Sequence, residues 1–286
     1  MINQKEGTHS FLFWLIIPFL MAWFSIAYIT GILFDKPLWV QTKVAETNDK
    51  QVVPYFAQNG SLAINLDQPF VSFWFDDAWL SQYLKAYPIL KEKNYPGVMA
   101  VPVNAVDTNN YMNWAQLKVI QKDGWQITNH SLSHNCEMQT WAEDKIAYEY
   151  KTSKLILWKN GLASDIFVTP CGVDSPIMLA QAEKQFMGYR TVNPGFNDPK
   201  NFSFYGFKVK NIDDKTTVAE MKGWIDEAKK NNLWLILVFH KIGDAIGEAT
   251  SDEFNTSTSD FKAVVDYVSA SNINVVVPQQ IMASQK

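Results

Sequence analysis

The stretch VSFWFDD, residues 71–77, is a mainly apolar run that ends in two adjacent aspartates. A strand that is apolar on both faces is typical of a parallel sheet covered by helices. Similar runs recur along the chain and alternate with longer amphipathic stretches, which predicts an α/β fold. We expect strands at 71–75, 97–103, 125–128, 166–169, 189–192, 233–239 and 274–277 and helices at 80–93, 114–122, 143–159, 177–185, 218–231 and 261–271. Seven such runs favour a β/α barrel over a small open sheet.

Reactive residue types gather where four of these runs end. They are Asp76 and Asp77, Asn129 and His130, Pro170 and Cys171, and His240. In a β/α barrel the carboxyl ends of the strands and the loops after them carry the catalytic residues. The sequence therefore predicts one site built from these loops.

The spacing of His130 and His134 predicts a metal site. On one turn of helix, residues i and i+4 share a face, so both imidazoles could reach one ion. Asp77 could add an oxygen ligand, which would give the open pattern of a catalytic zinc site. Asp76 would then be free to act as a base. The alternatives are two unrelated surface histidines, an aspartate that caps the next helix, and a His240 that only packs in the core.

The order of these motifs resembles the polysaccharide deacetylase family, which is carbohydrate esterase family 4 or the NodB homology domain. The resemblance covers 70–282 and rests on FDD, His-x-x-x-His, a Pro-x-Gly after a strand, and a strand that ends in histidine. FVTPCG at 167–172 resembles the subgroup of poly-N-acetylglucosamine deacetylases in particular. The resemblance to the family implies a distorted (β/α) barrel of the NodB-like, TIM type. It also implies a hydrolase of linear amides that removes N-acetyl groups from poly-N-acetylglucosamine, peptidoglycan or a chitin-like polymer.

The resemblance also implies a role for each matching residue. Asp76 would be the general base and His240 the general acid. The backbone N–H of Cys171, next to Pro170, would stabilise the oxyanion. The divalent metal, expected to be Zn²⁺ with Co²⁺ or Ni²⁺ as alternatives, would be bound by Asp77, His130 and His134.

The sequence departs from the family pattern at several positions. Trp74 and Ala78 stand where the family usually has threonine and glycine, and Val168 replaces an arginine that pairs with the base. Arg190 is the only arginine in the chain and could take over that pairing. The fourth family motif has no clear match, and its candidates are Asp198, Asp213 and Asp214. These gaps leave two alternatives open: an inactive deacetylase fold that binds or assembles carbohydrate at the membrane, and an esterase for O-acetylated polysaccharide.

Two cysteines and three aromatic residues near the expected loops allow more than one interpretation. Cys136 and Cys171 could form a disulfide, remain free thiols, or add a metal ligand at Cys171. Trp79, Tyr111 and Trp141 could stack on sugar rings or pack against neighbouring side chains.

The amino-terminal part predicts a membrane anchor. Residues 10–34 are uncharged, and 25 residues of helix rise about 37 Å, enough to cross a bilayer. A cleaved signal peptide or a buried helix is the alternative. We expect a tail at 1–9, a single-pass anchor at 10–34, a stalk or linker at 35–68, and the deacetylase domain at 69–286 on the periplasmic or extracellular side. A net charge of −4 without a basic cluster argues against a nucleic-acid partner.

Overall fold

The computed structural model describes residues 64–243 and 254–285. All of them belong to the second of the two units into which the chain divides, Pro54–Lys286. The predicted tail at 1–9 and anchor at 10–34 lie outside the described residues, and of the linker at 35–68 only the last five residues fall within them. Among the described residues no helix is both long enough and apolar enough to cross a membrane.

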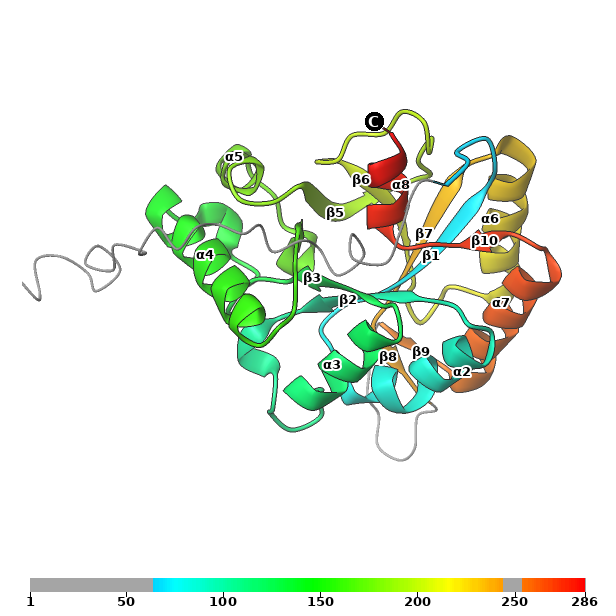
Figure 1. The fold of residues 1–286 in the computed structure, drawn as a ribbon, viewed down its shortest axis with the longest axis horizontal. Helices are drawn as coiled ribbons and strands as arrows, with labels where there is room; N and C mark the ends of the chain where they lie inside the picture. Colours follow the sequence, from blue (N-terminus) through cyan, green and yellow to red (C-terminus); the bar gives the residue numbers. More distant parts are fainter. Residues whose placement is uncertain (1–63, 244–253, 286) are drawn as a thin grey trace, which may run out of the picture. The chain divides into compact units, whose positions relative to one another are not determined.

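Seven parallel strands close into a barrel. They follow one another in chain order, and β7 pairs back along the whole of β1. The strands are β1 (Phe70–Phe75), β2 (Gly97–Val101), β3 (Gln126–Asn129), β4 (Ile166–Val168), β5 (Gly188–Pro194), β6 (Phe207–Asn211) and β7 (Trp234–Phe239). Figure 1 shows how β1, β2 and β3 cross the middle of this arrangement. The predicted distorted β/α barrel is confirmed.

The sixth and last strands differ from the prediction. The run at 274–277 forms only β10 (Asn274–Val275), which pairs with the first two residues of β1. The sixth barrel strand is instead β6, whose sequence FKVKN was not predicted as a strand. Phe207 and Val209 are buried while Lys208 is exposed, because only one face of this strand is covered. Because lysines alternate with apolar residues in β6, its sequence lacks the continuous apolar run that is typical of a strand buried on both faces.

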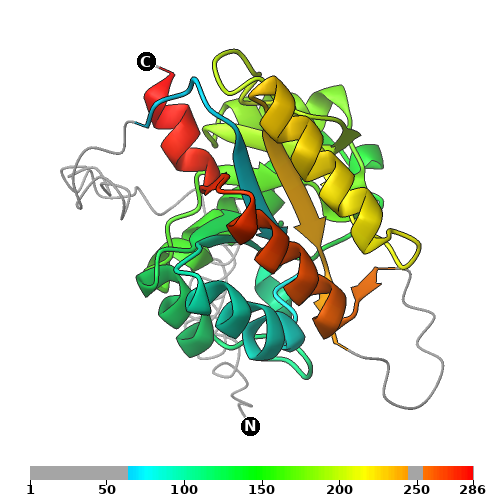
Figure 2. The same cartoon turned by 90° about the vertical axis from the view of Figure 1, so that its right-hand side faces the viewer.

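Helices cover the outside of the barrel, and Figure 2 shows α2, α6 and α7 on the side of β1 and β7. They are α2 (Tyr87–Glu92), α3 (Trp114–Lys122), α4 (Glu143–Lys159), α5 (Pro176–Glu183), α6 (Val218–Asn231) and α7 (Thr258–Ala270). One more helix of the described chain, α8 (Pro278–Ser284), lies elsewhere. The short elements are η3 (Gln82–Ala86), η4 (Val103–Ala105), η5 (Met138–Thr140), η6 (Pro170–Gly172), β8 (Lys241–Ile242) and β9 (Asn255–Thr256). The structure confirms the predicted bounds of α3, α4 and α6. Asn113 and Thr217 begin α3 and α6 with capping boxes, which satisfy N–H groups of the first turn.

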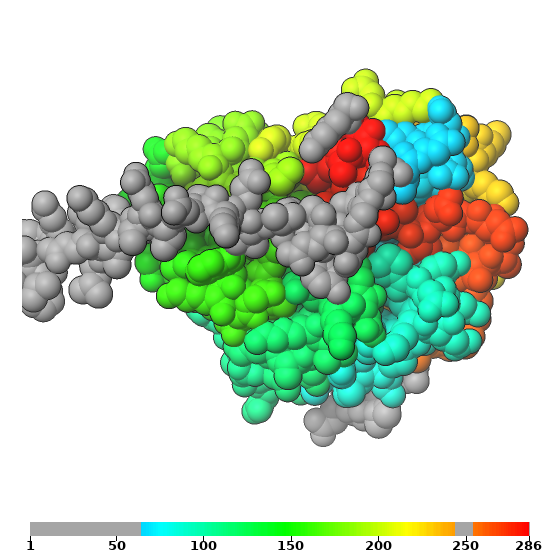
Figure 3. Space-filling view, in the orientation of Figure 1, coloured from blue at the N-terminus to red at the C-terminus, as the bar shows by residue number. Residues whose placement is uncertain are grey.

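Helix α8 packs against the barrel interior near the starts of the strands. Ile281 belongs to the same buried cluster as Phe70 and Trp234, the first residues of β1 and β7. The Ile64 N–H donates to Ser284 Oγ at 2.9 Å, and Figure 3 shows α8 beside the segment that leads into β1. The opposite end of the barrel, where the strands finish, carries the loops with the predicted site residues.

Candidate functional site

Three side chains converge above the ends of β1 and β3. Asp77 Oδ1 lies 3.0 Å from His134 Nε2 and 3.4 Å from His130 Nε2. One ligand atom from each residue lies within 4.8 Å of the others, so the three could hold one metal ion. His130 is buried and Asp77 and His134 are partly exposed, which leaves the group open on one side. The structure therefore brings the predicted ligand set together.

The two histidines do not lie on a helix as predicted. Residues 130–134 form an irregular loop after β3, and Ser131 and His134 have φ values of 66° and 53°. Glu149 of α4 fixes this loop, because its Oε2 accepts the N–H groups of Leu132 and Ser133, each at 2.9 Å. The loop shape, rather than helical spacing, makes the two rings converge.

The donor set fits a divalent cation. His130 Nδ1 lies 2.9 Å from the Val168 carbonyl oxygen, which can only accept, so Nδ1 carries the hydrogen and Nε2 is free to bind. Two imidazoles and one carboxylate, with positions left open, match a catalytic zinc site. Burial raises the pKa of Asp77, but the adjacent imidazoles of His130 and His134 outweigh burial and hold that pKa well below its usual range.

Asp76 does not belong to this ligand group and is bound by Arg190. Arg190 comes from β5, and its Nη2 donates to both oxygens of the Asp76 carboxylate, at 2.6 Å to Oδ1. Both side chains are almost fully buried, with 1% and 6% exposed. The guanidinium carbon lies 4.9 Å from the ring centre of Trp74, which packs beneath it. The structure thus pairs the predicted base with the only arginine of the chain.

His240 follows β7, and its imidazole also faces the Asp76 carboxylate. Its Nε2 lies 4.0 Å from Asp76 Oδ2. Burial lowers the pKa of His240, although the nearby charges of Asp76 and Asp77 act to raise it. Its Nδ1 is buried and has no hydrogen-bond partner in the described part of the chain.

The candidates for the fourth motif do not supply the missing partner of His240. Asp198 accepts the Lys200 N–H and Asp213 bonds to Thr216, so both act within their own loops. Asp214 is exposed. The prediction that one of these aspartates adjusts His240 finds no support among the described contacts.

The third motif lies beside the ligand group. Pro170 is buried and Cys171 is exposed, and both belong to η6 after β4. Cys171 is joined to Cys136 in a disulfide with a Cα–Cα distance of 5.4 Å. One ring nitrogen of His134 lies within 4.8 Å of both sulfur atoms. Of the three alternatives for these cysteines, the structure shows the disulfide.

Gln82 is a site residue that the sequence did not reveal. Its buried Nε2 donates to the backbone oxygens of Asp76, at 2.6 Å, and of His240, at 2.8 Å. It lies at the start of the π-helical turn η3, an irregularity that is frequent at functional sites. In sequence it is an ordinary glutamine within a predicted helix, so no local pattern marks it.

Comparisons with known proteins agree on the fold. Residues 63–192 match the family described as polysaccharide deacetylase. No curated protein matches the chain. The Xyl-CE4 domain of a multidomain xylanase from the hindgut metagenome of Trinervitermes trinervoides is 13% identical, with a TM-score of 0.52 over 75% of this chain and 90% of that one.

Two further structures share the barrel. A family 4 carbohydrate esterase from Streptomyces lividans, solved with acetate, is 12% identical with a TM-score of 0.50 over 73% of this chain and 92% of that one. A pseudoenzyme of the same family from Bacillus anthracis is 15% identical with a TM-score of 0.53 over 77% and 67%. Residues 63–192 are thus similar to the polysaccharide deacetylase family, and the barrel has the fold of carbohydrate esterase family 4.

Proposed function

We propose that the chain is a metal-dependent deacetylase that removes N-acetyl groups from an amino-sugar polysaccharide. The observation that carries this proposal is the convergence of Asp77, His130 and His134, with Asp76 beside them but bound to Arg190 instead. An acetylated polysaccharide as substrate is supported by the family match. Poly-N-acetylglucosamine, peptidoglycan and chitin-like polymers are the candidates.

The ligand set would hold Zn²⁺, or Co²⁺ or Ni²⁺ in its place. A divalent cation bound there supplies a Lewis acid for the acetyl carbonyl and lowers the pKa of a bound water toward about 7. Asp77 contributes an oxygen through Oδ1, and His130 and His134 contribute Nε2.

The other residues handle protons and charge. Asp76 takes the proton of the attacking water, and Arg190 keeps its carboxylate in one orientation. His240, which also faces Asp76, donates a proton to the departing amine. The Cys171 N–H donates to the oxyanion, and one such donor is typically worth about 10²–10³ in rate.

Two variants separate these roles. Asp76→Asn should keep the metal and lose about 10²–10⁴ in acetate release, because it removes the base that takes the proton; it also removes the buried partner of Arg190. His134→Ala should lose both metal and activity. The measurements are metal content and acetate release from N-acetylglucosamine oligomers, peptidoglycan and poly-N-acetylglucosamine. Full metal content and full activity in both variants would show that the site is wrongly assigned.

The same assay separates two alternatives. A protein that binds these oligomers but releases no acetate with metal present would be an inactive carbohydrate-binding form of the fold. Release from acetylated xylan alone, with weak dependence on His240, would indicate an O-acetyl esterase, because an ester loses its alcohol more easily than an amide loses its amine.

We further propose that the domain works on the periplasmic or extracellular side, tethered by residues 10–34. The Cys136–Cys171 disulfide supports this location, because disulfides persist in oxidising compartments.

A further inference from the structure

The two oxygens of Asp77 have different partners. Oδ1 faces the Nε2 atoms of both histidines, at 3.0 and 3.4 Å. Oδ2 accepts the indole Nε1–H of Trp79 at 3.0 Å. The carboxylate is therefore oriented from both ends: the imidazoles lie at one oxygen and a fixed donor lies at the other.

Trp79 is itself held in place by two other segments. Its backbone forms an antiparallel bridge with Tyr111, and the two rings stack with their centres 4.3 Å apart. The Nζ of Lys241, the residue after His240, lies 4.2 Å from the indole ring. The indole is packed between neighbours, which favours the packing interpretation of Trp79 over a free platform for sugar rings.

The backbone conformation before Trp79 gives a reason why the Asp77 carboxylate needs a hydrogen bond to fix it. Asp77 and Ala78 both have positive φ values, 77° and 57°, where residues other than glycine are uncommon. A carboxylate on this irregular turn is not positioned by regular secondary structure. The indole N–H donates to Oδ2, so it is well placed to fix the carboxylate.

We propose that Trp79 is a positioning residue that makes Asp77 bind the cation through Oδ1 alone. This inference rests on the metal site of the proposed function. With Oδ2 engaged by the N–H, one oxygen is left for the ion, and the coordination position that Oδ2 would take stays open. Without the N–H, Oδ2 can turn toward the ion or the whole carboxylate can rotate away. Partners of this kind typically contribute about 10–100-fold to metal affinity.

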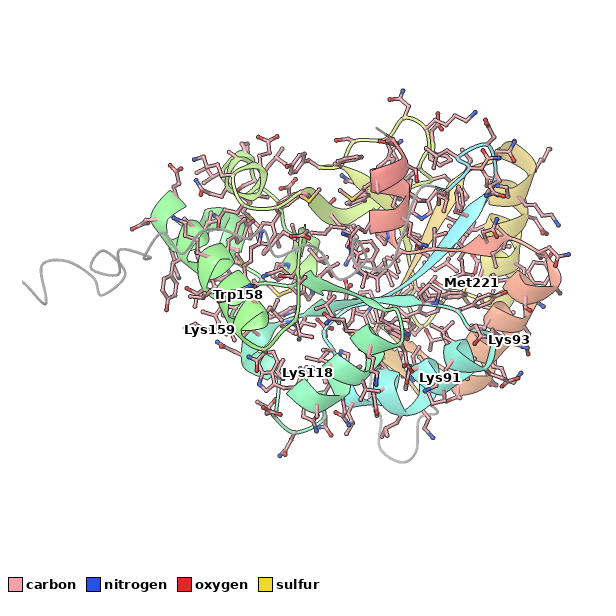
Figure 4. The ribbon with its side chains drawn as sticks, in the orientation of Figure 1. Lys91, Lys93, Lys118, Trp158, Lys159 and Met221 are labelled. Carbon is pink, nitrogen blue, oxygen red and sulfur yellow. A yellow bond between two sulfur atoms is a disulfide. The ribbon has the colours of Figure 1, made fainter. Side chains whose placement is uncertain are left out.

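The test is a Zn²⁺ titration of the full chain against a competing chelator. Trp79→Phe removes the N–H and keeps an aromatic ring against Tyr111. We expect it to bind Zn²⁺ about 10–100-fold more weakly than the wild type. The matched control is Trp158→Phe at the end of α4, where the exposed indole of Trp158 is labelled in Figure 4. This control should bind Zn²⁺ as the wild type does.

Asp77→Asn separates this inference from the proposed function. If the wild type binds no Zn²⁺, or if Asp77→Asn binds it as tightly as the wild type, the metal site fails and the inference with it. If Asp77→Asn loses Zn²⁺ while Trp79→Phe binds normally, only the role of Trp79 is refuted.

A second substitution separates the effect of the N–H from the effect of the ring shape. It also tests the proposal if Trp79→Phe does not fold. Placing 3-benzothienylalanine at position 79 replaces the N–H by sulfur and keeps the bicyclic ring. We expect the same loss of Zn²⁺ affinity. We also expect a change in the visible absorption of the Co²⁺-loaded protein, since that intensity depends on the coordination number. Wild-type affinity and an unchanged spectrum with this analogue would overturn the proposal.

Discussion

Replacing Arg190 by glutamine should be strongly destabilising, because it leaves the Asp76 carboxylate buried without its cation. The two side chains are 1% and 6% exposed, so solvent screening does not weaken the pair as it does at a surface. Removing one partner of a buried pair typically costs about 3–5 kcal/mol. For a domain of this size, that corresponds to a fall in Tm of about 6–20 °C.

The assay is urea unfolding of the metal-free wild type, Arg190→Gln, Asp76→Asn and the double variant. The double variant should recover part of the loss, because neither charge is then left alone. Arg190→Lys keeps the charge but not the planar set of donors, so it should lie between the wild type and Arg190→Gln. A loss below about 1 kcal/mol, or effects that add within about 0.5 kcal/mol, would refute a buried ion pair.

Three further predictions concern the loops around the site. Cys136→Ser with Cys171→Ser opens a loop of 35 residues and should lower the free energy of unfolding by about 3–4 kcal/mol, measured in urea without reductant; equal stability would mean that the disulfide does not form. Burial lowers the pKa of His240 below its ordinary 6.5, so its neutral form adds stability that is present above pH 6.5 and lost as the pH falls through the lowered pKa. Metal-free His240→Gln should therefore lose less stability than the wild type on acidification, and parallel pH curves would contradict this. Glu149→Ala leaves two loop N–H groups without their acceptor and should cost about 1–3 kcal/mol. Hydrogen exchange at those two amides should become faster in Glu149→Ala and return toward the wild-type rate in Glu149→Gln. Unchanged exchange in Glu149→Ala would contradict this role of Glu149.

Strands that are covered on both faces could be predicted from the sequence. Every residue of β1 and β7 is buried, and Ser72 is the one polar residue in these two strands, so each reads as an almost wholly apolar run. The strand β6 could not be found in this way, because its outward residues, such as Lys208, are polar. The run at 274–277 is apolar for another reason: Val276 and Val277 leave β10 and pack with α8 in the barrel interior.

The metal-ligand residues of the site could be predicted from the sequence, because their residue types and their positions after strand ends mark them. Asp77, His130 and His134 each follow a strand end and can bind metal, and a closed barrel brings such ends together. Gln82 and Glu149 act through side-chain bonds to the backbone, and Gln82 reaches His240 across 158 residues. No local pattern encodes such a contact, so these two residues required the fold.

Backbone strain links the ligand loops to the contacts that restrain them. Five non-glycine residues of the site have positive φ: Asp77, Ala78, Ser131, His134 and Cys171. The other five in the described chain are all asparagine or aspartate, which tolerate this region better. For residues that do not tolerate this region, such conformations typically cost about 1–3 kcal/mol each. They persist only where other contacts hold them.

Each strained segment has its own restraint. Trp79 bonds the side chain of Asp77, Glu149 accepts two N–H groups of the histidine loop, and the disulfide holds Cys171. The three restraints come from different parts of the chain, and all of them act on the loops that carry the ligands and the predicted oxyanion donor. The strained residues and their restraints thus fall on the loops that, under the proposed function, would hold the metal ligands and the oxyanion donor.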